Sequence, residues 1–464
     1  MLFAFYDFET TGVSPAFDQP LQFAAILTDD DFKEIKSVDI RCRLSDHILP
    51  SPIALAVTKV SPDLILNQER SLYAFAQELA ELITDWSPAI WIGYNTLDFD
   101  EKVFRQLFYQ NLIPNIYRTQ MDGNLRLDVL KHSIACWAYG SDALKFPISP
   151  NGKRTLKLDQ LAPLNGFADH AAHDALGDVR ATIHVASLVR NKAPDLWKQT
   201  IQNLDRGRLL KDLQSGRPYH LVERFGGHPP KIYTGVYCGM NAEKDKQIGF
   251  VDLNGKNIVG LLGADEALIE KAVSASTKLI RSVDLGSMPL LFPAKDIPAD
   301  LQQLAEQFAN QNDLWAVVGK KLAARFSDSE APTEIEDRIY EKFYDRADEK
   351  KLYQFHKVPW AERSAILNEI SDDRLRELGN RLLTLYAPEF ADAAFKKAFW
   401  GKMAMRWNGD EFYGDDEKNA GNTYKSVAAA LADLEKGERF KLGPELISEF
   451  KVFFENRKLA LNIT

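Results

Sequence analysis

Two acidic residues, Asp7 and Glu9, stand at the end of an apolar segment that opens the chain. The segment from Leu2 to Phe8 is apolar or aromatic except for one acid, which predicts the central strand of a buried sheet. Side chains alternate between the two faces of a strand, so these carboxylates point the same way. Two ionised acids that close repel each other unless a cation lies between them. The pair therefore predicts a divalent metal site, whereas the simpler alternative is a strand end that reaches solvent.

A second polar group follows the short apolar segment 89–94, which predicts another strand. Asn95, Asp98 and Asp100 lie in the turn after it, and a helix is expected to begin at or near Asp98. In a mixed α/β fold, the functional site is expected at the ends of the strands. Each of these side chains is, however, also a suitable cap for the helix, whose N-terminus favours acidic groups. The turn alone does not distinguish a site from a cap.

A third group, His173, Asp174 and Asp178, comes just before a periodic segment, 179–189, that predicts a helix. Asp174 is a good cap for this helix. A histidine here could take a proton from water near neutral pH. A lone histidine is more simply explained by a hydrogen bond to solvent or to a nearby carbonyl group.

The segments between these groups predict the elements that position them. Residues 21–28 and 38–44 have strand character and are separated by an acidic turn, which indicates an antiparallel meander. Residues 73–86 have helical periodicity. Together with the strand at 89–94 and the helices after it, these segments predict a mixed α/β layered fold.

The rest of the chain has a different character. Segment 218–262 is rich in Gly, Val and aromatic residues, with strand-like runs at 231–237 and 247–253, and it predicts a small barrel. Segment 300–325 is helical, and amphipathic helices follow a break at 327–332, interrupted by a polar loop at 408–422.

Length and composition are those of a folded protein of about three domains, with 464 residues of which 45% are hydrophobic. Cys42, Cys136 and Cys238 are odd in number, far apart and set among apolar residues, so we expect reduced buried thiols. The opening apolar run is too short for a membrane span and resembles no secretory signal, and no later run approaches twenty apolar residues. We therefore expect a cytoplasmic protein without membrane contact.

The net charge of −9 argues against a nucleic-acid partner, because phosphate binding is driven by basic surface. Net charge says little about a local groove. Segment 145–157 carries Lys145, Lys153, Arg154 and Lys157, with no acid between them. A phosphate-binding segment and an ordinary solvated loop explain this run equally well.

Taken together, the three polar groups resemble the motifs of the DEDDh exonuclease superfamily. Residues 7–12 read D-F-E-T-T-G, like the first motif; residues 95–100 resemble the second, N-x-x-x-F-D; residues 173–178 resemble the third, H-x-x-x-x-D. The resemblance implies an α/β fold like that of ribonuclease H for roughly the first 190 residues.

The same resemblance implies a role for each motif residue. Two Mg²⁺ ions, for which Mn²⁺ can substitute, would be held by Asp7, Glu9, Asp100 and Asp178, with His173 as general base. These five form the expected catalytic set. The substrate strand would be contacted by residues from several segments, namely Glu9, Thr10, Phe99, Arg105 and Lys157.

The whole chain is similar to the exonuclease I family of bacterial single-strand DNA exonucleases. That likeness rests on residues 20–26, 93–100, 108–111 and 172–182, and is thinner downstream. It implies an exonuclease domain at 1–190, an SH3-like β-barrel domain with helical insertions at 194–328, and an all-α domain at 331–464. Where the family has an arginine in an R-L-x-x-L run, this chain has Lys157, which keeps the charge but loses the bidentate fork.

The expected activity is that of a monomeric exodeoxyribonuclease that degrades single-stranded DNA from 3′ to 5′ and releases 5′-mononucleotides. The added domains would make cutting processive, in repair and recombination. The resemblance also implies binding of the acidic tail of single-strand DNA-binding protein, with Arg206, Arg208 and Arg217 as candidate contacts. Two alternatives remain: an exoribonuclease resembling ribonuclease T, and a non-catalytic module that binds single strands or their binding protein.

Overall fold

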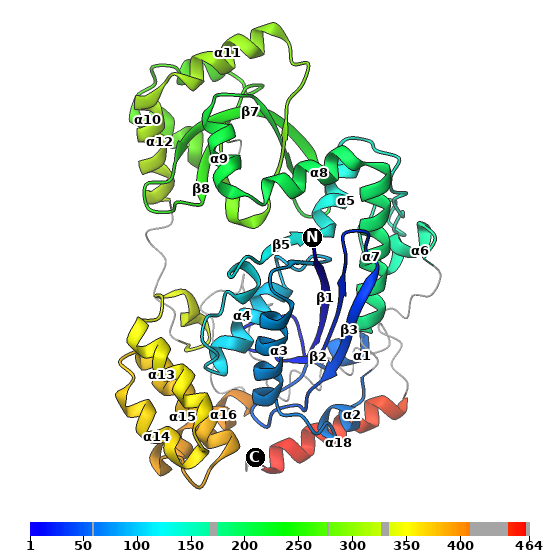
Figure 1. The fold of residues 1–464 in the computed structure, drawn as a ribbon, viewed down its shortest axis with the longest axis vertical. Coiled ribbons are helices and arrows are strands. Elements are labelled where there is room, and N and C mark those ends of the chain that lie inside the picture. The colour runs from blue at the N-terminus through cyan, green and yellow to red at the C-terminus, as the bar shows by residue number, and fades with distance from the viewer. Residues whose placement is uncertain (58–59, 168–173, 276–277, 326–333, 409–443, 461–464) are drawn as a thin grey trace.

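The computed structural model describes residues 1–57, 60–167, 174–275, 278–325, 334–408 and 444–460. Its elements form three groups along the long axis of the molecule (Figure 1). The N-terminal sheet and its helices lie in the middle, a second sheet with its own helices lies at one end, and the C-terminal helices lie at the other. The break predicted at 327–332 lies outside the described residues, as does the polar loop predicted at 408–422 except for Asn408.

The N-terminal sheet is mixed, with the order β3-β2-β1-β4-β5. Its strands are β1 (Phe3–Thr10), β2 (Pro20–Thr28), β3 (Glu34–Arg41), β4 (Ile90–Gly93) and β5 (Leu125–Asp128). β1 is the central strand, as its continuous apolar character predicted, and it pairs antiparallel with β2 and parallel with β4. The third strand was predicted at 38–44 but begins four residues earlier and ends three residues earlier, at Arg41; its first four residues are exposed and give no alternating apolar pattern.

Helices cover both faces of this sheet. They are α1 (Pro52–Val57), α2 (Pro62–Leu66), α3 (Leu72–Trp86), α4 (Asp100–Gln110), η1 (Arg118–Gln120), α5 (Val129–Ala138), α6 (Leu158–Leu164) and α7 (Ala175–Lys192). Tyr6 and Phe8 of β1 pack in the same core as Phe104 of α4. Phe3 and Phe5 point to the opposite face and pack in the same core as α7. Asp7 and Glu9 continue the face that α7 covers, because strand side chains alternate.

The second sheet has five strands, all paired antiparallel, in the order β10-β6-β7-β8-β9. The strands are β6 (Tyr219–Glu223), β7 (Lys231–Met240), β8 (Gln247–Asp252), β9 (Ile280–Asp284) and β10 (Leu290–Pro293). The helices around it are α8 (Pro194–Asn203), α9 (Arg206–Gln214), η2 (Ile258–Leu261), α10 (Glu266–Ser274), η3 (Leu285–Ser287), α11 (Ala299–Ala309) and α12 (Asn312–Ala324). The strands predicted at 231–237 and 247–253 correspond to β7 and β8.

The C-terminal part is helical, with η4 (Asp337–Tyr340), α13 (Arg346–Lys357), α14 (Trp360–Glu369), α15 (Asp373–Tyr386), α16 (Ala393–Asn408) and α18 (Pro444–Ala460). It packs directly on the N-terminal part: Phe355 of α13 and Leu378 of α15 share a buried core with Phe75 of α3. At the bottom of Figure 1, α18 runs beneath the N-terminal sheet, and its Phe450 and Phe454 pack in a core that includes residues of the segment after β3.

Two smaller expectations can be compared with the structure. The three cysteines are buried free thiols, as predicted, and burial raises the pKa of Cys136 to about 12. Among the helices that the structure describes, we find none that combines the length and the apolar character needed to cross a membrane.

Candidate metal site

The three acids Asp7, Glu9 and Asp178 come together on one face of the N-terminal sheet. Their carboxylate oxygens include a set in which all lie within 4.8 Å of one another, and within the described ranges no other group of three possible metal ligands does so. Asp7 and Glu9 share a face of β1, and Asp178 lies in the first turn of α7, which packs on that face. Hard carboxylate oxygens in such a group suit Mg²⁺ or Mn²⁺.

The fourth acid, Asp100, comes from α4, the helix that packs on the opposite face of β1. It is the first residue of α4 and is 4% exposed. Its Oδ1 accepts a hydrogen bond of 3.1 Å from the backbone N–H of Phe8, the residue between Asp7 and Glu9. Asp100 is therefore fixed against the strand that carries the other two acids.

The electrostatics of these acids indicate an excess of negative charge. Burial, reinforced by repulsion from Asp178 and Asp100, raises the pKa of Glu9 to about 8. Burial raises the pKa of Asp100 to about 8 as well, although the Phe8 N–H opposes that shift. Burial followed by repulsion from Asp100 and Glu9 holds the pKa of Asp7 well above its usual range. A bound divalent cation would relieve this repulsion, and the donor set fits one.

The residues before α7 differ in part from the prediction. Asp174 occupies the cap position, but its side chain makes no cap hydrogen bond. Its Oδ1 accepts instead from Gln22 Nε2 at 3.1 Å and Arg41 Nη2 at 3.2 Å, donors supplied by β2 and β3. His173, the predicted general base, lies outside the described residues.

The turn after β4 also differs from a simple cap. Neither Asn95 nor Asp98 caps α4, whose N-cap residue is Phe99 and has no side-chain cap bond. Asn95 adopts a positive φ of 67°, and its backbone N–H donates to Asp128 Oδ1 at 2.9 Å. Asp128 also caps α5, and sequence reasoning missed it; an acid that ends a short strand just before a helix was the available signal.

The predicted substrate-binding residues lie in varied environments. Thr10 donates to the Gly12 carbonyl oxygen at 2.6 Å, and Phe99 is half-buried against the core that contains Tyr6. Lys157 is exposed at the start of α6. Arg105 is only 18% exposed and is held by protein groups, with Nη2 3.8 Å from Glu101 and Nη1 3.3 Å from the Tyr340 hydroxyl. It is therefore less available to a phosphate than the sequence suggested.

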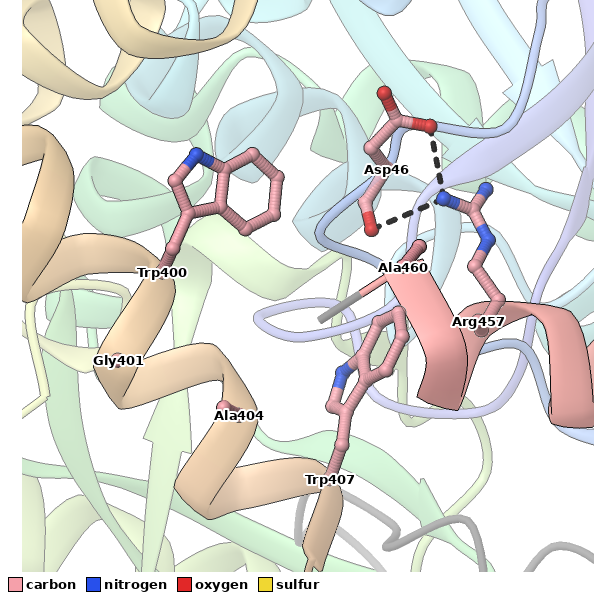
Figure 2. A pocket seen from close by; sticks show the side chains of 7 residues that line it. All are labelled: Asp46, Trp400, Gly401, Ala404, Trp407, Arg457 and Ala460. Atoms are coloured by element: carbon pink, nitrogen blue, oxygen red, sulfur yellow. Dashed lines mark hydrogen bonds and ion pairs between the residues drawn. The ribbon is translucent and has the colours of Figure 1, made fainter. Parts of the chain in front are cut away.

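A cavity of about 510 Å³ lies elsewhere, between α16 and α18 (Figure 2). Trp400 and Trp407 of α16 line it, and Arg457 of α18 closes one side by donating to Asp46 Oδ1 at 2.8 Å. None of the four acids lines this cavity, so it is separate from the metal site.

The comparisons with known proteins identify the family of the chain. The family model RNase_T, described as an exonuclease, matches residues 4–186. Exodeoxyribonuclease I of Escherichia coli K12 is 30% identical over 369 residues, which cover 75% of this chain and 77% of that protein. The chain belongs to the exodeoxyribonuclease I family. It is a nuclease, and exonucleases of this family generally use divalent metal ions.

Other members and solved structures extend the likeness along most of the chain. Exodeoxyribonuclease I of Haemophilus influenzae is 26% identical over 412 residues, covering 81% of this chain and 84% of that protein. The structure of exonuclease I from Methylocaldum szegediense is similar with a TM-score of 0.80 at 22% identity, covering 98% of this chain and 99% of the other. That of E. coli exonuclease I with a dA16 oligonucleotide has a TM-score of 0.78 at 24% identity, with the same coverage. These structures show the exonuclease I fold.

Proposed function

We propose that this protein hydrolyses single-stranded DNA from the 3′ end and releases 5′-mononucleotides. The observation that carries the proposal is the convergence of Asp7, Glu9 and Asp178 beside Asp100, in a member of the exodeoxyribonuclease I family. The E. coli relative has been solved with single-stranded oligonucleotides, which supports the substrate class.

The four acids would hold two Mg²⁺ ions. Such a pair lowers the pKa of a bound water and stabilises the charge that develops on the phosphate and the leaving 3′ oxygen. Asp7, Glu9 and Asp178 would be direct ligands, and Asp100 would act directly or through water. His173 would accept the proton of the attacking water; this role rests on its motif and its closeness in sequence to α7.

The substrate strand would lie next to these acids. Glu9, Thr10 and Phe99 would contact the terminal nucleotide, because they adjoin the metal ligands along β1 and before α4. The exposed Lys157 would contact a phosphate. Arg105, already held by Glu101 and Tyr340, would act mainly by shaping this wall of the site.

We also propose the division into an exonuclease domain at 1–190, an SH3-like barrel domain at 194–328 and an all-α domain at 331–464. The second sheet, which is separate and entirely antiparallel, and the helical C-terminal part support this division. In a monomer, the two added domains would keep hold of the strand between cuts and so make digestion processive.

Single-strand DNA-binding protein is the proposed protein partner, since exonuclease I has been solved in a complex described with it. Arg206 lies 3.9 Å from Asp245, and Arg208 lies 3.9 Å from Asp212, so nearby acids oppose binding of an acidic tail there. A better candidate surrounds Trp137, whose ring lies 5.6 Å from the Arg154 guanidinium and 5.5 Å from that of Arg224. Loss of peptide binding in Arg154→Ala, measured by fluorescence polarisation with an acidic peptide, would support this cluster.

The deciding experiment is digestion of a 5′-labelled single-stranded oligonucleotide with Mg²⁺ or with EDTA. A metal-dependent ladder that shortens from the 3′ end supports the proposal. Equal rates on matched RNA and DNA strands would favour the exoribonuclease alternative. Tight binding without cleavage would favour the non-catalytic module.

A further inference from the structure

The residue after Asp100 is an acid that no motif assigns. Glu101 is 1% exposed, yet it lies in the first turn of α4, where an acid would ordinarily face solvent. Three side chains from separate segments donate to its carboxylate: the Tyr6 hydroxyl at 3.0 Å, the Thr119 hydroxyl at 2.9 Å and Arg126 Nη1 at 3.1 Å. A buried carboxylate costs free energy unless it is paired and hydrogen-bonded, so these three donors stabilise Glu101 in its buried position.

Glu101 forms one of two links that join α4 to β1 at the metal site. The other is the bond from the Phe8 N–H to Asp100. Tyr6 and Phe8 flank Asp7 on β1, and Asp100 and Glu101 are adjacent at the start of α4, so the two links hold β1 on both sides of Asp7. Together with the packing of Phe104 on Tyr6 and Phe8, the two links constrain the start of α4 against β1 more closely than either hydrogen bond alone.

Two arginines interact with the Glu101 carboxylate and connect it to other parts of the molecule. Arg126 bridges it to the carbonyl oxygen of Gly286 in η3, to which Arg126 Nη2 donates at 3.1 Å. Arg105 lies 3.8 Å from it and reaches the Tyr340 hydroxyl of η4. Through these arginines Glu101 is connected to η3, which lies between two strands of the second sheet, and to η4 of the C-terminal part.

We propose that Glu101 is a positioning residue that sets the separation of Asp7 and Asp100, and hence the geometry in which these acids receive a metal ion. The proposal rests on the function proposed above. Partners that orient metal-ligating side chains typically change metal affinity by about 10- to 100-fold when they are removed. Glu101 acts through Tyr6 and the α4 backbone and contacts neither substrate nor metal.

The test compares two tyrosine variants that each lose one buried hydrogen bond. Tyr6→Phe removes the hydrogen bond from β1 to Glu101. Tyr109→Phe removes a 2.9 Å hydrogen bond from α4, the helix that carries Glu101, to the Ile335 carbonyl oxygen. Both tyrosines are buried, so the two changes are matched in chemistry. Mn²⁺ binding is measured by electron paramagnetic resonance without DNA, and kcat and KM are measured on a short single-stranded oligonucleotide.

We expect Tyr6→Phe to bind Mn²⁺ about 10-fold more weakly and to lower kcat with little change in KM. Tyr109→Phe is expected to stay within about twofold of the wild type in both measurements. Glu101→Gln, which loses the charge that the arginines hold, should weaken Mn²⁺ binding at least as much as Tyr6→Phe.

Equal Mn²⁺ affinity and kcat in Tyr6→Phe and Tyr109→Phe would overturn the inference, even if Glu101→Gln failed to fold. That result is distinct from failure of the proposed function. A wild-type protein that neither binds Mn²⁺ nor cuts DNA would refute the function itself, whereas a competent wild type with two equivalent variants refutes only the positioning role.

Discussion

At the scale of single residues, Asp7 and Asp178 are the acids whose loss has the simplest consequence. They lie on β1 and α7, and each supplies one of the three converging carboxylates. We expect Asp7→Ala or Asp178→Ala to abolish cleavage while the protein stays folded, because removal of one acid lessens the repulsion among the rest. Single-turnover digestion together with circular dichroism measures both effects. Near-normal turnover in either variant would contradict the metal-site assignment.

The raised pKa values of Glu9 and Asp100, both about 8, predict how pH affects the metal-free protein. The unfolded chain loses these protons near pH 4, whereas the folded protein retains them until about pH 8. The folded state therefore binds more protons over that range, and the free energy of unfolding falls as pH rises through it. A divalent cation replaces the protons, so its stabilising effect should grow with pH.

The corresponding measurement is the increase in Tm caused by Mg²⁺ over EDTA, at pH 5.5 and at pH 8. We expect the increase to be larger at pH 8 and to shrink in Asp7→Asn, which removes one negative charge from the site. An increase of the same size at both pH values would argue against a cation bound by these acids.

The sequence was sufficient for some of these residues and insufficient for others. Strand alternation alone predicted that Asp7 and Glu9 share a face. Asp178 joins them only because α7 packs on that face, and the motif resemblance rather than local pattern indicated this. Glu101 was missed because its partners come from three separate segments; Arg105, four residues later on the same helix, was the only local signal.

At the scale of elements, the strongly apolar ones were predictable and the exposed or short ones were not. The strand at 21–28 and the helix at 73–86 were predicted to within a residue or so, because their buried faces leave a clear pattern. The four residues that begin β3 are exposed, so they carry no such pattern. The short strands β9 and β10 were not predicted, because an alternating apolar pattern is hard to recognise over four or five residues.

At Gly93, the last residue of β4, the backbones of β4 and β1 lie very close together. A Cβ added there would lie 2.7 Å from the Tyr6 carbonyl oxygen and 2.1 Å from Thr96 Cγ2. The backbone of β1 cannot yield without moving Asp7, so we expect Gly93→Ala to destabilise the fold by about 1 to 3 kcal/mol and to slow cleavage. Chemical denaturation and a cleavage assay measure the two effects.

Gly260 provides the matched control, since a Cβ added there meets nothing within 4 Å. Gly260→Ala is expected to leave stability and cleavage close to those of the wild type. If Gly93→Ala behaved in the same way, the close approach of β4 to β1 would not be needed to hold the acids.

At the scale of the whole molecule, the C-terminal helices are joined to the helix that carries Asp100. Arg381 of α15 donates to Glu336 Oε1 at 2.6 Å, and the Glu336 carbonyl oxygen accepts from Gln106 of α4 at 2.8 Å. Arg381 and Glu336 are both buried. Gln106 therefore ties α4 to Glu336 of the helical part, and Arg381 ties Glu336 to α15, through buried side chains.

Arg381→Met would leave the Glu336 carboxylate buried without its nearest cation, a change that typically costs about 3 to 5 kcal/mol. Arg406, 3.8 Å from the same carboxylate, would offset part of this cost. We expect the packing of α15 on the nuclease part to loosen, so that digestion of long strands becomes less processive while the rate on a short oligonucleotide changes little. Hydrogen exchange of α15 and digestion with a DNA trap measure these effects.

Arg376→Met on the same helix is the control, because the acceptors of Arg376 among the described residues are the nearby Ile370 and Ser371 carbonyl oxygens. It should leave processivity unchanged. If Arg381→Met increased hydrogen exchange in α15 but left the length of each processive run unaltered, docking of these helices would not be what retains the strand, and the second sheet would have to do so. A parallel fall in the short-oligonucleotide rate would instead mean that the helical part supports the chemistry through α4.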